Sequence, residues 1–416
     1  MSELKHKKFP IVSGLDIGET KVVYVIGEIK PSGIEVIGKG EATHTGVRHG
    51  AIINIEQVSN SIAQAKDEAE IMSGTPSEGV WVSVSGKHIQ SFDSFGMTPI
   101  RNKEIKKEDI DRVIDVARSI AIPSDRKVLH VLPKNYKIDT QEGIIDPLGM
   151  SGVRLESCVH IITGCSATLQ NTVKCVERAG LKLKGMVLQQ LASSEAILSE
   201  DEKALGVGLV DIGGGTCDMI VFDNGSVDQI SMIPVGGQNF VQDLSLGLKT
   251  TQLNALDLLR KCGHALEEMV NPDESVEIES IGGRQSRTVS KVEICKIVGA
   301  RAEETIELVK NWIAENKLEK KLGSGIVFTG GVSQLPGFLE MSDFLLDLPV
   351  RKGVPSLVGG MLDTVNTPEY STVIGLLIYG SKSAPKRSAQ IMEKPAYISG
   401  SSATWNRIKE FFTDVF

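Results

Sequence analysis

The sequence predicts an α/β protein with two similar halves and a ligand cleft between them. One observation is a repeated pattern, at residues 13–25 and 206–222, in which an apolar strand ends in an aspartate and a glycine turn leads into a second apolar strand. Another is that each copy is followed by a further hairpin strand, after the turns at 31–33 and 223–225. Helical periodicity between the strands completes the α/β pattern.

The second copy has the composition of a phosphate-binding loop. Gly213, Gly214 and Gly215 can adopt the positive φ values that let successive backbone amides converge on an anion, and Thr216 adds a hydroxyl donor. Asp211 would repel a phosphate directly, so we expect it to hold, through water, a Mg²⁺ ion that bridges the phosphate oxygens. The loop therefore predicts a nucleotide together with Mg²⁺. An ordinary glycine-rich hairpin turn is the alternative.

The first copy places Asp16 at the corresponding position and follows it with the turn residues Gly18, Glu19, Thr20 and Lys21. Two glycine hairpins, each with an acid, would hold a triphosphate between them, with Asp16 as a second water-mediated contact to Mg²⁺. This pattern is not a Walker loop, in which the phosphates lie where a strand passes into a helix.

Composition and charge narrow the class of protein. A chain of 416 residues predicts about two to four compact units, and 41% hydrophobic with 24% charged residues is typical of a globular protein. The net charge of −8 argues against nucleic acid as a partner. Six cysteines without a CxxC pair and a start without an apolar signal region predict reduced thiols in a cytoplasm, without zinc. No run of 18 apolar residues occurs, which leaves peripheral attachment as the predicted membrane contact.

The first half is interrupted by a module of different texture. Residues 1–86 contain the first hairpin, a helix over 55–73 and a strand over 80–85, whereas residues 87–163 alternate strands and one charged helix without a glycine hairpin of this type. We therefore interpret 87–163 as an insertion, after which residues 164–203 return the chain to the first half.

Three segments of the insertion carry a specific resemblance. The runs DRVIDVARSIAIPSDRKVLHVLP, QEGIIDPLGMSGVRLE and VHIITG closely resemble the FtsA family of bacterial cell-division proteins, and the resemblance extends over residues 12–380. It implies an actin-like two-domain fold with duplicated halves and two inserted subdomains. The implied subdomains are 1A at 1–86 and 164–203, 1C at 87–163, 2A at 204–243 and 297–380, and 2B at 244–296.

The resemblance also implies a function. FtsA relatives bind ATP, polymerise, and anchor filaments of the tubulin-like division protein FtsZ to the cytoplasmic face of the inner membrane at the septum. Subdomain 1C would mediate self-association and contact with later division proteins. Any ATPase activity would be weak.

Further nucleotide-binding residues follow from the resemblance. Gln189 matches the family position that orients water near the γ-phosphate, and because Gln is a poor general base we expect slow hydrolysis; an ordinary amide at a strand end is the alternative. Two more glycine elements would contact the nucleotide, and their residues are Gly236, Gly237, Asn239, Gly330, Gly331 and Val332. The chain departs from the family at Leu256 and Leu259, where relatives carry a Glu and a Lys about the adenosine. Adenosine recognition should be weaker for that reason.

The second insertion contains two arginines on a glycine-rich loop, Arg284 and Arg287. Guanidinium groups suit a carboxylate-bearing peptide, although solvated surface arginines are the alternative. By resemblance, this module would bind the C-terminal tail of FtsZ.

The end of the chain predicts a membrane anchor. Residues 381–402 lack hydrophobic periodicity and are rich in Ser, Pro and Lys, as in a flexible linker. Residues 403–416 regain helical periodicity with apolar residues on one face, and these are Trp405, Ile408, Phe411, Phe412, Val415 and Phe416. An amphipathic helix at a lipid surface explains them better than a core helix.

A phosphotransferase or ATP hydrolase such as a sugar kinase, on the same fold, is the alternative function. A catalytic Asp in a substrate cleft and the absence of a lipid-seeking tail would favour it.

Overall fold

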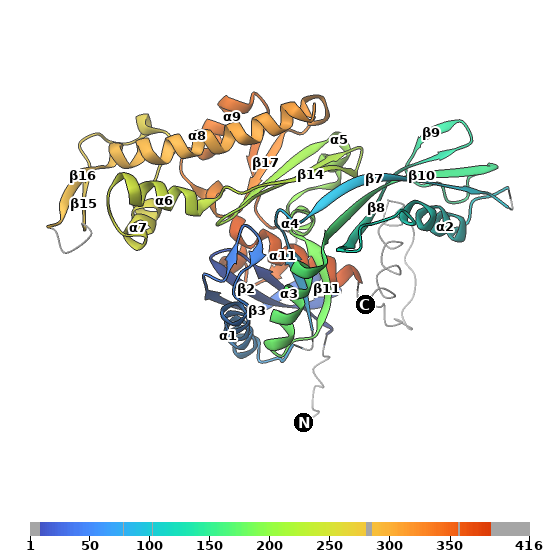
Figure 1. The fold of residues 1–416 in the computed structure, drawn as a ribbon, viewed down its shortest axis with the longest axis horizontal. Coiled ribbons are helices and arrows are strands. Elements are labelled where there is room, and N and C mark those ends of the chain that lie inside the picture. Colours follow the sequence, from blue (N-terminus) through green and yellow to red (C-terminus); the bar gives the residue numbers. More distant parts are fainter. Residues whose placement is uncertain (1–8, 78, 102, 280–284, 357, 384–416) are drawn as a thin grey trace.

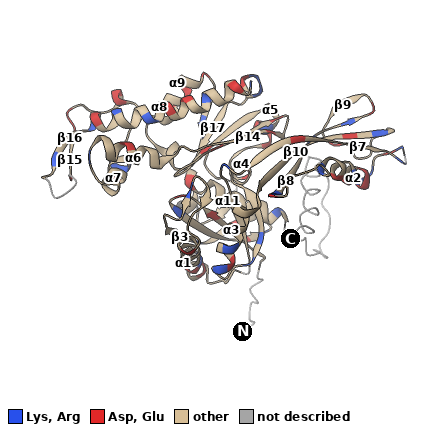
Figure 2. Cartoon of the chain, in the orientation of Figure 1, with Lys and Arg blue, Asp and Glu red and all other residues tan. Residues whose placement is uncertain are grey.

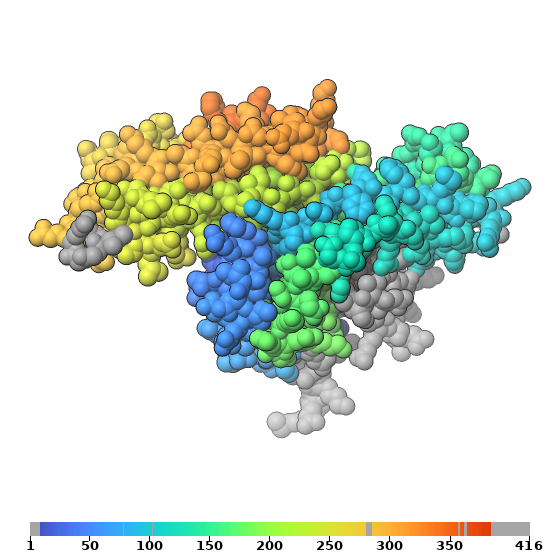
Figure 3. Space-filling view, in the orientation of Figure 1, coloured from blue at the N-terminus to red at the C-terminus, as the bar shows by residue number. Residues whose placement is uncertain are grey.

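The computed structural model describes residues 9–77, 79–101, 103–279, 285–356 and 358–383. Two sheets with their helices form the two halves, which meet at the centre of an elongated molecule (Figure 1). The space-filling view shows the first half, blue and green, beneath the yellow and orange second half (Figure 3). The predicted duplicated α/β architecture is therefore confirmed.

The first half is built on a six-stranded sheet in the order β11-β6-β1-β2-β3-β19. Its strands are β1 (Ile11–Ile17), β2 (Lys21–Lys30), β3 (Gly33–Thr43), β6 (Val80–Val84), β11 (Leu183–Leu188) and β19 (Val358–Gly360). Strand β1 is antiparallel to β2 and parallel to β6. A separate pair is formed by β4 (Val47–Arg48) and β5 (Ala51–Ile52).

Both faces of this sheet are covered, which explains why β2 is apolar at nearly every position. Tyr24 and Ile26 pack against α1 (Ile55–Ser73) and α3 (Ser166–Arg178), while Val23 and Val25 belong to the core around α4 (Gln189–Ile197) and α11 (Ser371–Ser383). Helix α1 begins at a cap in which Asn54 accepts a hydrogen bond from the amide of Gln57.

The second half repeats the arrangement with five strands in the order β14-β13-β12-β17-β18. Its strands are β12 (Val207–Ile212), β13 (Cys217–Asp223), β14 (Ser226–Ile233), β17 (Ile326–Thr329) and β18 (Val350–Lys352). Strand β12 is antiparallel to β13 and parallel to β17, as β1 is to β2 and β6. The helical elements are α5 (Glu200–Leu205), α6 (Gly237–Gly247), α8 (Lys291–Glu315), η2 (Glu319–Lys321), η3 (Gly331–Gln334) and α9 (Phe338–Leu346).

Two modules extend from opposite ends of the long axis (Figure 1). One module, which we call the insert, is a sheet in the order β7-β10-β8-β9 with one helix, formed by β7 (Gln90–Pro99), α2 (Lys107–Arg118), β8 (Arg126–Ile138), β9 (Gln141–Ile144) and β10 (Arg154–Cys165). The other, which we call the distal module, contains α7 (Gln252–Cys262), η1 (Glu267–Met269), β15 (Ser275–Ile278) and β16 (Arg287–Ser290).

An ion network fixes the insert to the second half. The Lys134 ammonium on β8 lies 3.0 Å from Asp228 on β14, and Lys321 lies 2.6 Å from the other oxygen of the same carboxylate. The hydroxyl of Ser226 donates to the carbonyl of Lys134 at 2.7 Å. The insert is therefore held at the outer strand of the second sheet.

The end of the described chain belongs to the first half, although residues 297–380 were predicted to belong to the second. Both β19 and α11 pack with the first half; between them lie α10 (Leu362–Val365) and η4 (Pro368–Tyr370). Every residue over 371–380 is buried, so α11 needs apolar partners on all sides and finds them in α4 and the first sheet. A Cβ on Gly375 would lie 1.8 Å from the carbonyl oxygen of Ala192, so the two helices touch backbone to backbone.

A buried charge cluster joins the ends of α4, α5 and α11. Glu195, whose side chain is 2% exposed, forms ion pairs with Lys203 on α5 and with Lys382 on α11. The chain crosses from the first half to the second between Glu195 and Lys203. The charge cluster therefore links this crossover to the end of the described chain.

Candidate functional site

A cleft of about 1040 Å³ lies between the two halves and is lined by both glycine turns. Its lining includes most of the predicted residues, namely Asp16, Gly18, Glu19, Thr20, Lys21, Gln189, Asp211, Gly213, Gly214, Gly215, Thr216, Gly237, Gly330, Gly331 and Val332. Gly236 and Asn239 lie behind the second turn rather than in the lining. Asn239 accepts a hydrogen bond from the amide of Gly236 at the start of α6.

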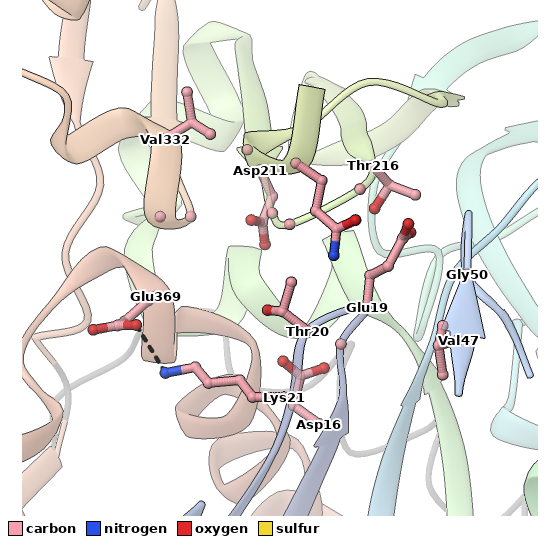
Figure 4. Close-up of a pocket in the computed structure, with 18 of the residues that line it drawn as sticks. Asp16, Glu19, Thr20, Lys21, Val47, Gly50, Asp211, Thr216, Val332 and Glu369 are labelled. Atoms are coloured by element: carbon pink, nitrogen blue, oxygen red, sulfur yellow. Dashed lines mark hydrogen bonds and ion pairs between the residues drawn. The ribbon is translucent and has the colours of Figure 1, made fainter. Parts of the chain in front are cut away.

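Asp16 stands at the end of β1, and its carboxylate points into the cleft toward Asp211 from the opposite half (Figure 4). The hydroxyl of Ser83 on β6 donates to Asp16 Oδ1 at 2.5 Å. Burial raises the pKa of Asp16 to about 6, against the lowering effect of the Ser83 hydrogen bond, and the Asp211 charge adds to the rise. A cation in the cleft would favour the ionised form.

Asp211 occupies the same place on β12 and is 3% exposed. The hydroxyls of Ser193 on α4 and Thr372 on α11 donate to its Oδ2 at 2.8 and 3.3 Å, and Gln189 also contributes a hydrogen bond. Burial raises the pKa of Asp211 despite these donors. The carboxylate is thus fixed in orientation by two helices, with Gln189 beside it.

A third carboxylate, Asp218, was not among the predicted residues. It is fully buried on β13, directly opposite Asp211 in the hairpin register. The hydroxyls of Ser85 and Thr216 donate to it at 2.5 and 2.7 Å, and burial raises its pKa to about 7. Since Ser85 follows β6, the bond joins the two halves beneath the cleft. The sequence did contain a signal for Asp218. It lies two residues after Thr216, and residues two apart along an extended chain point to the same side.

Two glycines of the second turn lie close to the first turn. None of Gly213, Gly214 and Gly215 has a positive φ, so the predicted reason for them is wrong. A Cβ on Gly215 would lie 1.9 Å from Glu19 Oε2, and one on Gly214 would lie 2.9 Å from Thr20 Cγ2, whereas one on Gly213 would meet nothing closer than 3.8 Å. A side chain at Gly214 or Gly215 would therefore require Thr20 or Glu19 to move.

Lys21 is held by acids at the mouth of the cleft. Its ammonium lies 3.0 Å from Glu41 Oε2 on β3 and 2.8 Å from Glu369 Oε2 on η4, the latter contact being drawn in Figure 4. The predicted phosphate contact of Lys21 would therefore require it to exchange partners.

The far end of the cleft is apolar. Leu256 and Leu259 from α7 line it together with Val332 and Leu335 from the opposite side. Gly330 has a φ of 80°, and a Cβ there would lie 2.5 Å from Asp211 Oδ1, so this position demands glycine on both counts. The apolar walls suit a flat base, and nucleoside binding at this end stays a prediction.

The predicted peptide-binding arginines are placed in part. Arg287 on β16 donates to the carbonyl of Leu248 at 2.7 Å, which engages one edge of its guanidinium, and Arg284 lies outside the described residues. An open hollow of about 410 Å³ lies nearby between α6 and α8, and its lining is Asp243, Lys296, Ile297, Ala300, Arg301 and Glu304. Acidic and basic residues alternate along α8 (Figure 2), and Arg301 is already paired with Asp243 and Glu304.

Metal-ligand clusters and membrane-spanning helices are both absent from the described residues. The described part of the chain contains no cluster of three or more His, Cys, Asp or Glu side chains that could hold a metal ion. It also contains no helix long and apolar enough to cross a bilayer. Of the predicted linker at 381–402, residues 381–383 belong to α11, so the prediction is wrong for them. The rest of the linker and the predicted helix at 403–416 lie outside the described residues.

Two solved structures resemble this fold at low sequence identity. The PilM-PilN type IV pilus biogenesis complex matches with a TM-score of 0.63 and 14% identity over 89% of this chain and 98% of that chain. MreB5 of Spiroplasma citri bound to ADP matches with a TM-score of 0.56 and 13% identity over 90% and 97% of the two chains. The predicted actin-like fold is confirmed.

Sequence comparisons identify closer relatives. A family model described as the SHS2 domain inserted in FtsA matches residues 86–163, and one described as cell division protein FtsA matches 208–375. Cell division protein FtsA from Pseudomonas aeruginosa is 41% identical over 371 residues, which are 89% of each chain. The protein of the same name from Neisseria meningitidis is 43% identical over 369 residues, or 88% of this chain and 89% of that one. On this evidence the chain belongs to the FtsA family of bacterial cell division proteins.

Proposed function

We propose that this protein is an ATP-binding, polymerising scaffold of cell division that attaches FtsZ filaments to the cytoplasmic face of the inner membrane at the septum. The observation that carries the proposal is the cleft, in which two glycine turns and two facing carboxylates, Asp16 and Asp211, meet from the two halves.

The residues present fit a nucleotide held with Mg²⁺. Asp16, Glu19, Asp211 and Glu369 line the cleft against Lys21 and Arg260, so a polyphosphate would meet net negative charge unless a divalent cation came with it. Asp16 and Asp211 would hold the ion through water. When bound, Mg²⁺ would neutralise the phosphate oxygens and favour the ionised form of both aspartates.

Hydrolysis would be slow in this cleft. Gln189 begins α4 beside Asp211 and is the proposed water-positioning residue, but its amide cannot take a proton from water. Turnover well below about 1 s⁻¹, the lower end for kinases, is expected. The nucleotide would then serve assembly more than chemistry.

Self-association and partner binding are proposed for the two modules at the ends of the molecule. The insert, at residues 87–163, would contact neighbouring copies and later division proteins. The distal module, at 244–296, would bind the FtsZ tail. Because Arg287 already bonds to Leu248, the adjacent hollow with the exposed Lys296 is a second place for an acidic tail within reach of the same peptide.

Membrane attachment is proposed for residues 403–416. Burial of several large apolar side chains at about 25 cal/mol per Å² would bind one such helix reversibly, and a polymer would add many weak contacts. The linker carries Lys386, Arg387 and Lys394, so attraction to anionic lipid is expected to come mainly from it.

The nucleotide proposal is tested by thermal unfolding of the full chain with and without Mg-ATP. A ligand at 100 times its Kd should stabilise the protein by about 2.7 kcal/mol. The absence of any shift, with Mg-ADP equally inactive, would remove the nucleotide from the proposal.

The anchor is tested by co-sedimentation with vesicles that contain anionic lipid. Trp405→Glu should release the protein, whereas Asn406→Glu, with the same added charge on the polar face, should change binding little. Vesicle binding that survives removal of residues 403–416 would contradict the anchor.

Binding of an FtsZ-tail peptide should fall in Arg287→Ala or Lys296→Ala and in higher salt. An affinity unchanged in the double variant would exclude both residues.

A further inference from the structure

Lys21 and Arg260 are the lysine and arginine side chains among the described residues that line the cleft. Lys21 follows the first glycine turn directly, while Arg260 lies on α7 at the apolar end. A phosphate between the two turns would therefore find its nearest protein cation in Lys21. That cation is already neutralised by two carboxylates, and its ammonium also lies 4.9 Å from the centre of the Tyr370 ring.

The two carboxylates differ in what else holds them. Glu41 is also bound by Lys39 at 2.9 Å and by the Tyr370 hydroxyl. Burial alone would raise its pKa, but hydrogen bonds from Tyr370, Lys39 and Lys21 lower it to about 2. Glu41 would therefore stay compensated if Lys21 turned away.

Glu369 lacks that support. Among the described residues, Lys21 is the one hydrogen-bond partner of its carboxylate, which is 36% exposed at the mouth of the cleft. Its release into water would cost little, because a partly exposed ion pair is screened by solvent and contributes little to stability. Of the two acids, Glu369 is the one that an incoming anion can displace.

We propose that Glu369 is an internal competitor for the nucleotide. Its carboxylate holds the Lys21 ammonium while the cleft is empty, and a phosphate group takes the ammonium over when a nucleotide binds. This inference rests on the proposed nucleotide binding and adds its regulation. It makes Glu369 a residue that lowers the affinity for phosphate, although it lies on η4, far along the chain from either glycine turn.

The competition is tested with Glu369→Gln in titrations of the full chain with Mg-ATP. The Kd should fall roughly two- to fivefold, the ratio that corresponds to one partly exposed ion pair. Lys21→Ala should weaken binding, and Lys21→Ala/Glu369→Gln should show the Lys21→Ala affinity, because the competitor acts through the lysine. Glu35→Gln is the matched control, since Glu35 pairs with Lys30 on the same sheet away from the cleft, and its Kd should equal the wild-type value.

The outcomes separate this inference from the nucleotide proposal. A Glu369→Gln protein that binds Mg-ATP as the wild type does, or more weakly, overturns the competition while nucleotide binding stands. Equal gains from Glu369→Gln with and without Lys21 would also overturn it, since the carboxylate would then repel phosphate directly. A wild-type protein without measurable affinity would instead refute the proposed function itself. If Glu369 had only a structural role, Glu369→Gln would lower the stability of the protein without lowering the Kd for Mg-ATP, and this result would also overturn the competition.

Discussion

The two glycine hairpins have the same topology but differ in the side chains that they carry. In both, an aspartate ends the first strand and a parallel strand lies on its other side. Opposite Asp16 in the register stands Val23, whereas opposite Asp211 stands a second acid, Asp218. The first turn carries Glu19 and Lys21, while the second turn is formed by three glycines.

This difference divides the work of binding between the halves. Both hairpins carry a carboxylate with a raised pKa that accepts from a hydroxyl group, Asp16 in the first and Asp211 in the second. The second hairpin adds Asp218 and offers backbone groups at its three glycines. The first hairpin adds two long charged side chains, Glu19 and Lys21, whose partners can change.

The largest effect should come from pH, through the acid that distinguishes the second hairpin. Burial raises the pKa of Asp218 from its ordinary value of 3.8 to about 7 in the folded protein, so its protonated form favours folding. This contribution to the free energy of unfolding is fully present below about pH 4 and is lost as the pH rises toward 7. The total loss is about 4 kcal/mol, because the pKa differs by roughly three between the two states.

Asp218→Asn removes this titration, so the ligand-free variant should gain stability over the wild type as the pH rises from 5 to 8. Denaturant unfolding at several pH values checks it. Parallel pH profiles for the two proteins would show that Asp218 is not the group responsible, and Asp228→Asn, at the ion network with the insert, serves as a control acid.

A smaller effect, on the affinity for Mg-ATP, is expected when the aspartate of one hairpin loses its charge. Asp211→Asn keeps the shape and the hydroxyl contacts but takes away one of two proposed contacts to the ion. Loss of such an outer contact typically costs 10- to 100-fold in affinity, or about 1.4 to 2.7 kcal/mol. Mg-ATP titration measures it, and a Kd equal to that of the wild type would place the ion elsewhere.

The smallest expected effect tests how tightly the second glycine turn packs against the start of α6. A Cβ on Gly236 would lie 2.7 Å from the amide nitrogen of Gly215, whereas one on the adjacent Gly237 would meet nothing closer than 3.5 Å. Gly236→Ala should therefore cost about 1 to 2 kcal/mol by displacing the second turn, and Gly237→Ala should cost less than that. Equal thermal stabilities for the two variants would mean that the turn has room to shift.

The duplication could be predicted because it depends on local patterns. An apolar strand, an acid, a glycine turn and another strand specify a hairpin wherever they occur, and the repeat implied two halves before any contact was known. The facing of Asp16 and Asp211 followed from the same symmetry. The reason for the glycines was wrong because it considered one turn alone, whereas the space they provide is needed by Glu19 and Thr20 from the other half.

Other features depend on partners distant in the sequence. Helix α11 is buried on every side, so its sequence has no polar face from which to tell which half would cover it. The ion pairs of Lys21 join residues 20 and 348 positions apart, and no local pattern connects them. Gln189 was expected at the end of a strand and instead begins α4, a difference of one residue that turns its amide toward Asp211.

The charge cluster around Glu195 connects helix α11 with the crossover between the halves. Among the described residues α11 extends to residue 383, and Lys382 in its last turn pairs with Glu195. The same helix begins beside Asp211, about 15 Å away at 1.5 Å per residue, and the contact between Gly375 and Ala192 prevents it from sliding along α4. Helix α11 thus couples the orientation of Asp211 in the cleft to the ion pairs at the crossover, because one helix carries both contacts.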